Sequence, residues 1–147
     1  MATIRIQTVV TIVDDLGNAG QPFVFEKTIS ALTNVEERNF AIAADQTRII
    51  WDPVTDAGET MTTFKFLLLA ADGNLDVEFT ANEANANEVL DVKRVVKGLP
   101  LMLGSDVTYF GASGATQGFG GTLDVIDKFR VDEPASVARI LKVIMGT

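Results

Sequence analysis

Carboxylates are the residues of this 147-residue chain whose types and spacing could do chemistry. Asp124 and Asp127 are close in sequence, and so are Asp76 and Glu78. Two carboxyl groups held near each other are the equipment of general acid–base catalysis, as in glycoside hydrolysis. The residues that alternate with Asp76 and Glu78 are apolar, which predicts that both carboxylates lie on the solvated face of a strand. A carboxylate-based hydrolase therefore ranks lowest among the candidate functions.

Oxygen ligands suited to calcium recur in the same region of the chain. Asp72, Asn74 and Asp76 occupy alternating positions, and Glu83 stands where the last ligand of an EF-hand loop would fall. Val77 occupies the position that such a loop gives to glycine, and no flanking helices are predicted. A turn followed by a strand explains this spacing better. We predict no metal site, and weak surface binding of Ca²⁺ stays an open alternative.

The chain contains no histidine and no cysteine. Histidine is the usual base that activates a serine or threonine nucleophile, and cysteine is itself a nucleophile and metal ligand. No local motif supports a Ser–Lys pair in their place. The sequence therefore predicts a protein that is not an enzyme, with no catalytic residues and no cofactor.

Residues 111–121 include five glycines. No lysine lies between Tyr109 and Val125, although a phosphate-binding P-loop requires one. A strand is predicted after this segment, whereas a dinucleotide-binding loop leads into a helix. We expect a long connection whose backbone can lie close to a partner. Phe119 within it could insert into a neighbouring subunit or fold back over its own core.

The net charge of −8 arises from 12 basic and 20 acidic residues. This balance lacks the basic surface that binds nucleic acid. It indicates either solubility at high concentration or docking on a basic partner. Apolar runs such as 66–71 are far shorter than the roughly 20 residues of a membrane span. Neither nucleic acid nor a membrane is a predicted partner.

Short apolar segments separated by Gly, Asn and Asp predict one all-β domain over residues 1–147. Ile4–Val13 and a second strand after Pro22 form a predicted hairpin around the turn at 16–20. Residues 34–38 are predicted to be a connection, and 136–145 favours a strand over a helix. Further strands are predicted at 39–43, 47–51, 60–71, 75–80, 89–97, 99–103 and 122–131.

Roughly nine or ten short strands at this spacing are typical of a sandwich or barrel. The predicted fold is a jelly-roll-like antiparallel β-sandwich with an extended N-terminal strand and a Gly-rich loop. Trp51, at the end of a strand, fits the core or an interface anchor. β-augmentation through Ile4–Val13 is one docking mode open to the chain. The candidate interface residues are Ile4, Ile6, Trp51, Tyr109, Phe110 and Phe119.

Several segments of the second half carry a resemblance to a known class. They are the strand–turn–strand at 66–79, the piece at 98–106, the Gly-rich loop, residues 121–127 and the ending at 135–147. With these features, residues 62–147 resemble small β-rich virion proteins of tailed bacteriophages. The resemblance implies a capsid decoration, or cement, protein, made in the host cytoplasm and bound on the virion exterior. It further implies a homotrimer that stabilises the lattice of the major capsid protein, and it implies no catalytic residue.

A phage tail or carbohydrate- and receptor-binding module on the same fold is the alternative function. Sugar-binding platforms use exposed Trp or Tyr rings, and the chain has only Trp51 and Tyr109 to offer. The placement of these two rings therefore bears on the choice between the two functions.

Overall fold

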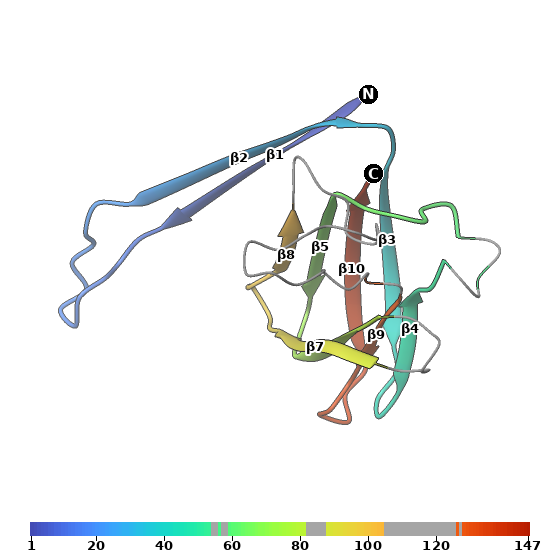
Figure 1. The fold of residues 1–147 in the computed structure, drawn as a ribbon. Coiled ribbons are helices and arrows are strands. Elements are labelled where there is room, and N and C mark those ends of the chain that lie inside the picture. The colour runs from blue at the N-terminus through green and yellow to red at the C-terminus, as the bar shows by residue number, and fades with distance from the viewer. Residues whose placement is uncertain (54–55, 57–58, 82–87, 105–125, 127) are drawn as a thin grey trace.

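The computed structural model describes residues 1–53, 56, 59–81, 88–104, 126 and 128–147. These residues form ten β-strands and contain no helix, as the sequence predicts for the fold class (Figure 1). Within them there is accordingly no helix with the length and apolarity to cross a membrane. The strands build a two-layered antiparallel sandwich and, apart from it, a two-stranded hairpin.

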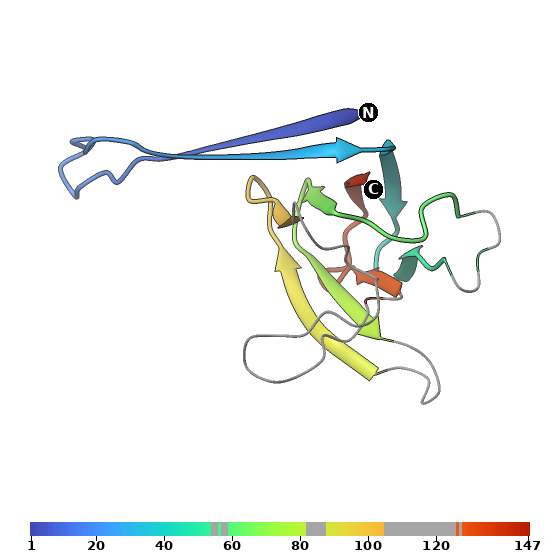
Figure 2. The ribbon, with the colours of Figure 1, turned by 45° about the horizontal axis from the view of Figure 1, so that its top comes forward.

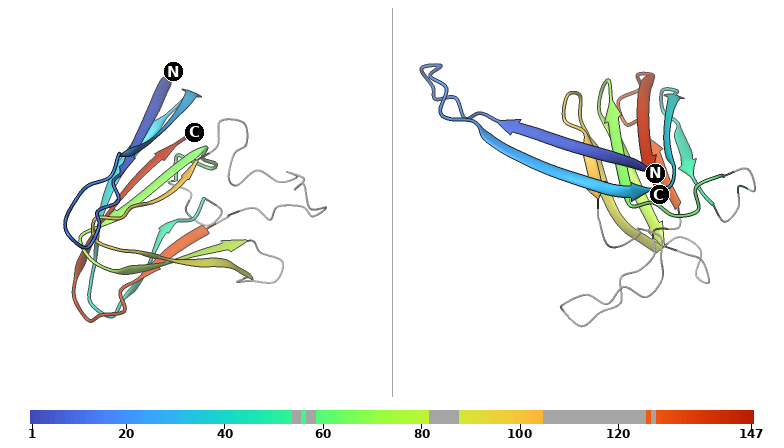
Figure 3. Two further views of the ribbon diagram at one scale, coloured as in Figure 1. Left: turned by 90° about the vertical axis from the view of Figure 1, so that its left-hand side faces the viewer. Right: turned by 90° about the horizontal axis from the view of Figure 1, so that it is seen from above.

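Each layer of the sandwich is a sheet of four antiparallel strands (Figures 1 and 3). In spatial order, the first sheet contains β3 (Val35–Ile42), β10 (Arg139–Gly146), β5 (Phe66–Ala71) and β8 (Leu101–Gly104). The second contains β4 (Thr47–Trp51), β9 (Lys128–Asp132), β6 (Leu75–Ala81) and β7 (Glu88–Val95). The last two strands in sequence thus occupy interior places, one in each sheet.

Alternation of apolar and polar residues explains how the two sheets enclose a core. Leu75, Val77 and Phe79 of β6 are buried, while Asp76 and Glu78 between them point outward. The predicted strand with one wet face is therefore confirmed. An aromatic cluster fills the space between the layers, with ring centroids 5.3 Å apart for Trp51–Phe64 and 5.9 Å apart for Trp51–Phe129 and Phe79–Phe129.

The hairpin of β1 (Ala2–Val10) and β2 (Phe23–Leu32) is the feature that departs from a plain sandwich. Among the described residues these two strands pair only with each other. The hairpin projects beyond the edge strand β8 as a long arm (Figures 1 and 2). We call residues 1–32 the arm, and its outer part, residues 9–25, the tip.

A compact turn closes the tip of the arm. The Asp14 carboxylate accepts backbone hydrogen bonds from Leu16 at 2.9 Å and Asn18 at 2.8 Å, and Gly17 has φ of +84°. Glycine adopts this left-handed conformation without the steric cost of a Cβ. The predicted hairpin and its turn at 16–20 are confirmed.

Two predicted boundaries in the sandwich are wrong. Residues 34–38 were expected to be a connection, but all of them except Asn34 belong to β3, which pairs with β10 along its length. Glu36 and Arg38 are half-buried in an ion-pair cluster with Glu59, so their polarity does not mark a loop. The predicted strand 60–71 begins only at Phe66.

Other predictions for the sandwich are confirmed. β4 coincides with the predicted strand 47–51, β8 lies at a sheet edge, and the segment 136–145 forms strand β10 after a turn. Part of the predicted strand 122–131 is β9, which begins at Lys128. The rest of that prediction, and the Gly-rich loop at 111–121, lie outside the described residues.

Candidate functional site

The base of the arm is fixed to the outer face of the first sheet by a second, smaller apolar cluster. Ile29, Leu32 and Phe66 are fully buried there, and Ile4 and Ile6 of β1 pack against them. Gly146 of β10 permits this contact, because a Cβ on it would lie 3.0 Å from Leu32 Cδ1. We call this cluster the seat of the arm.

Beyond the seat, no other described part of the chain covers the arm. Every residue from 9 to 28 is exposed, and the tip holds half of the large apolar side chains exposed in the described structure. The exposed fraction is 64% for Ile12, 87% for Leu16 and 61% for Phe25. The others are Val9, Val10, Val13, Phe23 and Val24. Contiguous exposed apolar surface of this kind marks sites of protein interaction.

The strand register shows that the exposed stripe continues the buried one. Ile4 is opposite Ile29 in the seat, and farther out Thr8 is opposite Phe25 and Val10 is opposite Phe23. Opposed residues of an antiparallel pair share a face, so Phe25, Val10 and Phe23 extend the apolar face of the seat outward. The tip therefore presents to solvent the kind of surface that the base buries.

The other face of the arm changes character along its length. Near the base, Arg5 donates to the Glu26 carboxylate at 3.1 Å, and the Gln7 amide donates to it at 2.9 Å. Farther out, Val9 and Val24 are opposite each other on this face. This face is therefore polar near the base and apolar at the tip. As a result, both faces of the arm are apolar only where the arm stands free of the sandwich.

An apolar groove of about 460 Å³ lies where the arm leaves the sandwich. Its lining comes mainly from β1, from β5 and β10 of the first sheet, and from the edge strand β8, and Figure 3 shows the arm running along that sheet. The apolar side chains that line it include Ile4, Ile6, Phe66, Leu68, Met102 and Ile144. Arg5 is the single charged side chain among the described residues that line this groove.

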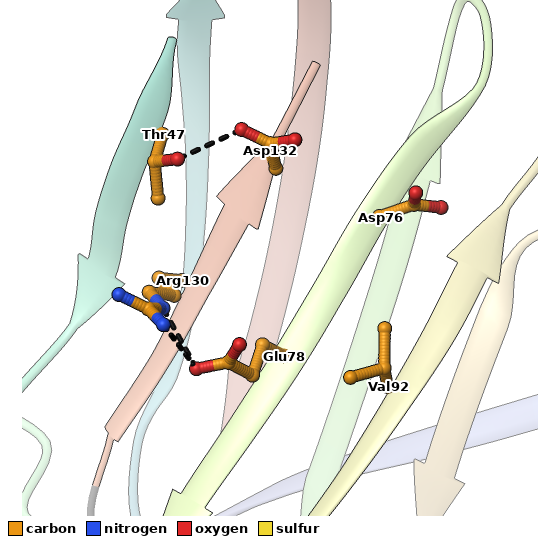
Figure 4. A pocket seen from close by; sticks show the side chains of 6 residues that line it. All are labelled: Thr47, Asp76, Glu78, Val92, Arg130 and Asp132. Atoms are coloured by element: carbon orange, nitrogen blue, oxygen red, sulfur yellow. Dashed lines mark hydrogen bonds and ion pairs between the residues drawn. The ribbon is translucent and has the colours of Figure 1, made fainter. Parts of the chain in front are cut away.

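A second, polar pocket of about 330 Å³ lies on the outer face of the second sheet. Figure 4 shows it lined by Thr47, Asp76, Glu78, Val92, Arg130 and Asp132, which come from four neighbouring strands.

The carboxylates of the polar pocket are all engaged. Arg130 pairs with Glu78 at 2.7 Å, Arg94 pairs with Asp76 at 2.6 Å, and the Thr47 hydroxyl donates to Asp132 at 2.7 Å. Hydrogen bonds from Arg94 and its charge hold the pKa of Asp76 below its usual range. Cross-strand pairs of this kind stabilise a sheet. The geometry therefore fits a structural ladder better than an acid–base pair.

The calcium-like spacing at 72–76 serves the β5–β6 turn. The Asp72 carboxylate accepts a hydrogen bond from the backbone N–H of Ile140 at 3.0 Å, and Asp76 points toward Arg94. Glu83 lies outside the described residues. Over the part of the chain that the structure describes, no group of three or more acidic, histidine or cysteine side chains is placed to hold a metal.

The structure brings together only part of the predicted interface. Ile4 and Ile6 lie half-buried in the seat and line the groove. The prediction of Trp51 as an interface residue is corrected, because Trp51 is 1% exposed and its indole donates to the Met61 carbonyl at 2.7 Å. It is a core residue of this chain, not a surface anchor. Tyr109, Phe110 and Phe119 lie outside the described residues, as do Asp124 and Asp127.

The sequence pointed to Ile4–Val13 as a docking segment, but the apolar residues of the tip were not among the predicted interface residues, although a signal was present. Val9–Val10, Ile12–Val13 and Phe23–Val24–Phe25 are runs of consecutive apolar residues. A half-buried strand alternates, so consecutive apolar residues in a two-stranded hairpin place apolar side chains on both faces. Such a hairpin needs cover from elsewhere.

Comparison with protein-family models, curated proteins and solved structures gave no match. The arm, the groove and the polar pocket are therefore the features of the described structure that bear on function.

Proposed function

We propose that this chain is a noncatalytic structural protein of a virion, a decoration protein that binds the major capsid protein lattice of a tailed phage. The observation that carries the proposal is the arm, with its uncovered apolar tip. An isolated two-stranded hairpin is marginally stable in water, and its apolar faces favour contact with another protein. A rigid body with a projecting arm is suited to linking neighbours in an assembly.

The strand order supports a jelly-roll connectivity for the sandwich. β3 neighbours β10 in one sheet, β4 neighbours β9 in the other, and the chain passes between sheets at most connections. A jelly roll has eight strands in two sheets, built from two Greek keys, and is a frame of viral capsid and lectin domains. The arm is then an addition at the N-terminal side of that frame.

The dimensions and charge of the molecule fit a bracing role. The nine residues of β1 reach about 30 Å at the usual rise per residue. The inner part of β1 is packed in the seat, and the tip beyond it stands clear of the sandwich, where it can contact a neighbour (Figure 2). The net charge of −8 disfavours contact with packaged DNA and favours a place on the outside of a particle. The homotrimer is part of this proposal.

Binding to empty shells of the major capsid protein tests this function. We expect the chain to co-sediment with the shells, to saturate at a fixed ratio to the capsid subunit, and to raise the melting temperature of the shells. Absence of co-sedimentation at saturating protein would contradict the proposal. Removal of the residues before Asp14 would also strip Ile4 and Ile6 from the seat, so substitutions confined to the tip are the cleaner variants.

The polar pocket favours a second candidate function, that of a receptor- or carbohydrate-binding module. Its hydroxyl, carboxylate and guanidinium groups could hydrogen-bond a sugar, and lectins also use the jelly-roll frame. The burial of Trp51 removes one of the two rings that could have formed a stacking platform. Glycan-array binding that is lost in Thr47→Ala and Arg130→Ala, but retained when the tip is altered, would favour this module over the decoration protein.

A further inference from the structure

We infer that the arm tip of one copy docks into the apolar groove of a second copy, so that copies join head to tail. The partner is another molecule of this same chain. The contact is between copies, so it does not depend on the proposed capsid binding and can be measured on the isolated protein.

The tip is out of reach of the groove on its own molecule. The seat holds the arm at its base, and Ile4–Thr8 of β1 form part of the groove lining, so the arm is itself one wall of the groove. The tip begins just beyond that wall, at Val9, and leads away from the sandwich (Figures 2 and 3). The described part of the same molecule therefore offers the tip no cover, and a second copy presents a groove that could.

The chemistry of the tip matches that of the groove. Phe23, Phe25 and Val10 extend the face that packs in the seat, and residues of that seat also line the groove. A docked tip would thus contact the half-buried Leu68 and Ile144 and the exposed Met102 on the edge strand β8. The docked contact would be continuous with an apolar cluster that the molecule already forms.

The distribution of charge favours contact through the arm. The arm carries two basic and three acidic residues, so nearly all of the net charge of −8 belongs to residues 33–147. Copies therefore repel one another less through the arm than through the sandwich. Among the described residues that line the groove, the one charged side chain is Arg5, which already pairs with Glu26, so the docked contact would be apolar rather than ionic.

Tip and groove are different surfaces, so their contact is heterologous. A heterologous contact closes into a ring when the rotation between copies permits and otherwise extends as a filament. In a ring every copy uses its tip once and its groove once, which leaves no apolar tip exposed. A ring of three copies is the trimer of the proposed function.

The test uses one variant for each surface, followed by a mixture. Phe23→Asp with Phe25→Asp alters the tip, and Met102→Glu alters the groove. Pro100→Glu is a second groove variant at an exposed position. Ile49→Asp, an exposed apolar position far from both surfaces, is the matched control. Circular dichroism and thermal melting verify that each variant is folded before its native mass is measured by sedimentation.

We expect the wild type and Ile49→Asp to sediment as the same oligomer, and the tip and groove variants to sediment as monomers of 15.8 kDa. An equimolar mixture of tip and groove variants should form a heterodimer with twice the monomer mass, since one intact tip and one intact groove remain. Ring closure adds avidity that this dimer lacks, so the mixture is examined at high concentration.

Three results would overturn the inference. The first is a wild type that stays monomeric at all concentrations. The second is a folded groove variant that keeps the wild-type mass while the tip variant is monomeric, because that pattern indicates a symmetric tip-to-tip contact. The third is a mixture of folded variants that remains monomeric. If Met102→Glu does not fold, Pro100→Glu decides the same question.

Discussion

Trp51 is held in the core of the sandwich by three contacts. It packs edge to face with Phe64, stacks with Phe129, and donates its indole N–H to the Met61 carbonyl. The sequence left open whether this lone tryptophan belongs to the core or to an interface, because an apolar ring at a strand end fits both. Only the contacts with residues distant in sequence resolve the choice.

Truncation of Trp51 should be among the most destabilising single changes in the chain. We expect Trp51→Ala to lower the free energy of unfolding by about 3–5 kcal/mol through loss of buried apolar contact. Trp51→Phe should cost about 1–3 kcal/mol, because the buried Met61 carbonyl loses its donor. Urea denaturation followed by far-ultraviolet circular dichroism measures both. Ile49→Ala, at an exposed position, is the control, and a Trp51→Ala loss no larger than that of the control would contradict this role.

The Asp76–Arg94 pair should make stability depend on pH in the acid range. The pKa of Asp76 is lowered in the folded state, so the pair stabilises the fold above about pH 4, the usual pKa of an aspartate. This contribution is lost as the pH falls through the lowered pKa. Arg94 is more than half exposed, so we expect Asp76→Asn to cost less than about 1 kcal/mol at pH 7.

Urea midpoints of wild type and Asp76→Asn, measured from pH 7 to pH 2, check this expectation. The two proteins should differ at pH 7 and converge in acid, where Asp76 is protonated in both states. Arg94→Gln should follow the same course, since it removes the other half of the pair. A difference that stays constant over the whole range would show that the ion pair is not its cause.

At the scale of strands, the local pattern of apolar and polar residues predicted the position of most strands but not where each one begins and ends. Alternation placed β6 correctly, because Leu75, Val77 and Phe79 face a core while the residues between them face water. Residues 34–38 do not alternate apolar with polar residue types, because the half-buried positions 36 and 38 hold Glu and Arg. Arg38 pairs there with Glu36 and Glu59. Met61 had the opposite effect and made the predicted strand 60–71 begin too early. It is buried in the core without belonging to a strand.

The order of the strands could not be predicted from local sequence at all. β3 pairs with β10 and β4 with β9, across most of the length of the chain. Such pairings depend on register between distant segments, which periodicity within one segment does not encode. The same limit applied to the candidate site. The hairpin could be predicted, whereas the point at which the sandwich stops covering it could not.

The attachment of the arm should be sensitive to Gly146. A Cβ there would lie 3.0 Å from Leu32 and 3.4 Å from Ile4, so a branched side chain would push the arm away from β10. We expect Gly146→Val to lower stability by about 1–3 kcal/mol, as overpacking commonly does. Amide hydrogen exchange should also accelerate in β1 and β2 while the core of the sandwich stays protected.

Ile140→Val, an exposed position in the same strand, is the control for this change. Unchanged exchange in β1 and β2 of Gly146→Val would mean that the seat does not hold the arm.

For the whole molecule, the balance between apolar attraction and acidic repulsion should appear in the response to salt. Raising NaCl from about 0.05 to about 0.5 M shortens the screening length to a few ångströms and weakens repulsion between copies. If copies join through their arms, we expect self-association to strengthen as salt is added. Sedimentation at both salt concentrations measures this, with the tip variant as control. Weaker association at high salt would indicate an interface dominated by ion pairs.

The place of the last strands also has a consequence for synthesis. β10 lies between β3 and β5, and β9 lies between β4 and β6, so both sheets lack an interior strand until residues 128–146 have left the ribosome. The arm emerges before the sandwich, with an apolar tip and nothing yet to hold its base. A nascent chain of this protein therefore exposes apolar, unpaired strands through most of its translation. During this time it is prone to aggregate with neighbouring nascent chains. Its yield in a cell should depend on chaperones that act at the ribosome, even though the finished sandwich needs none.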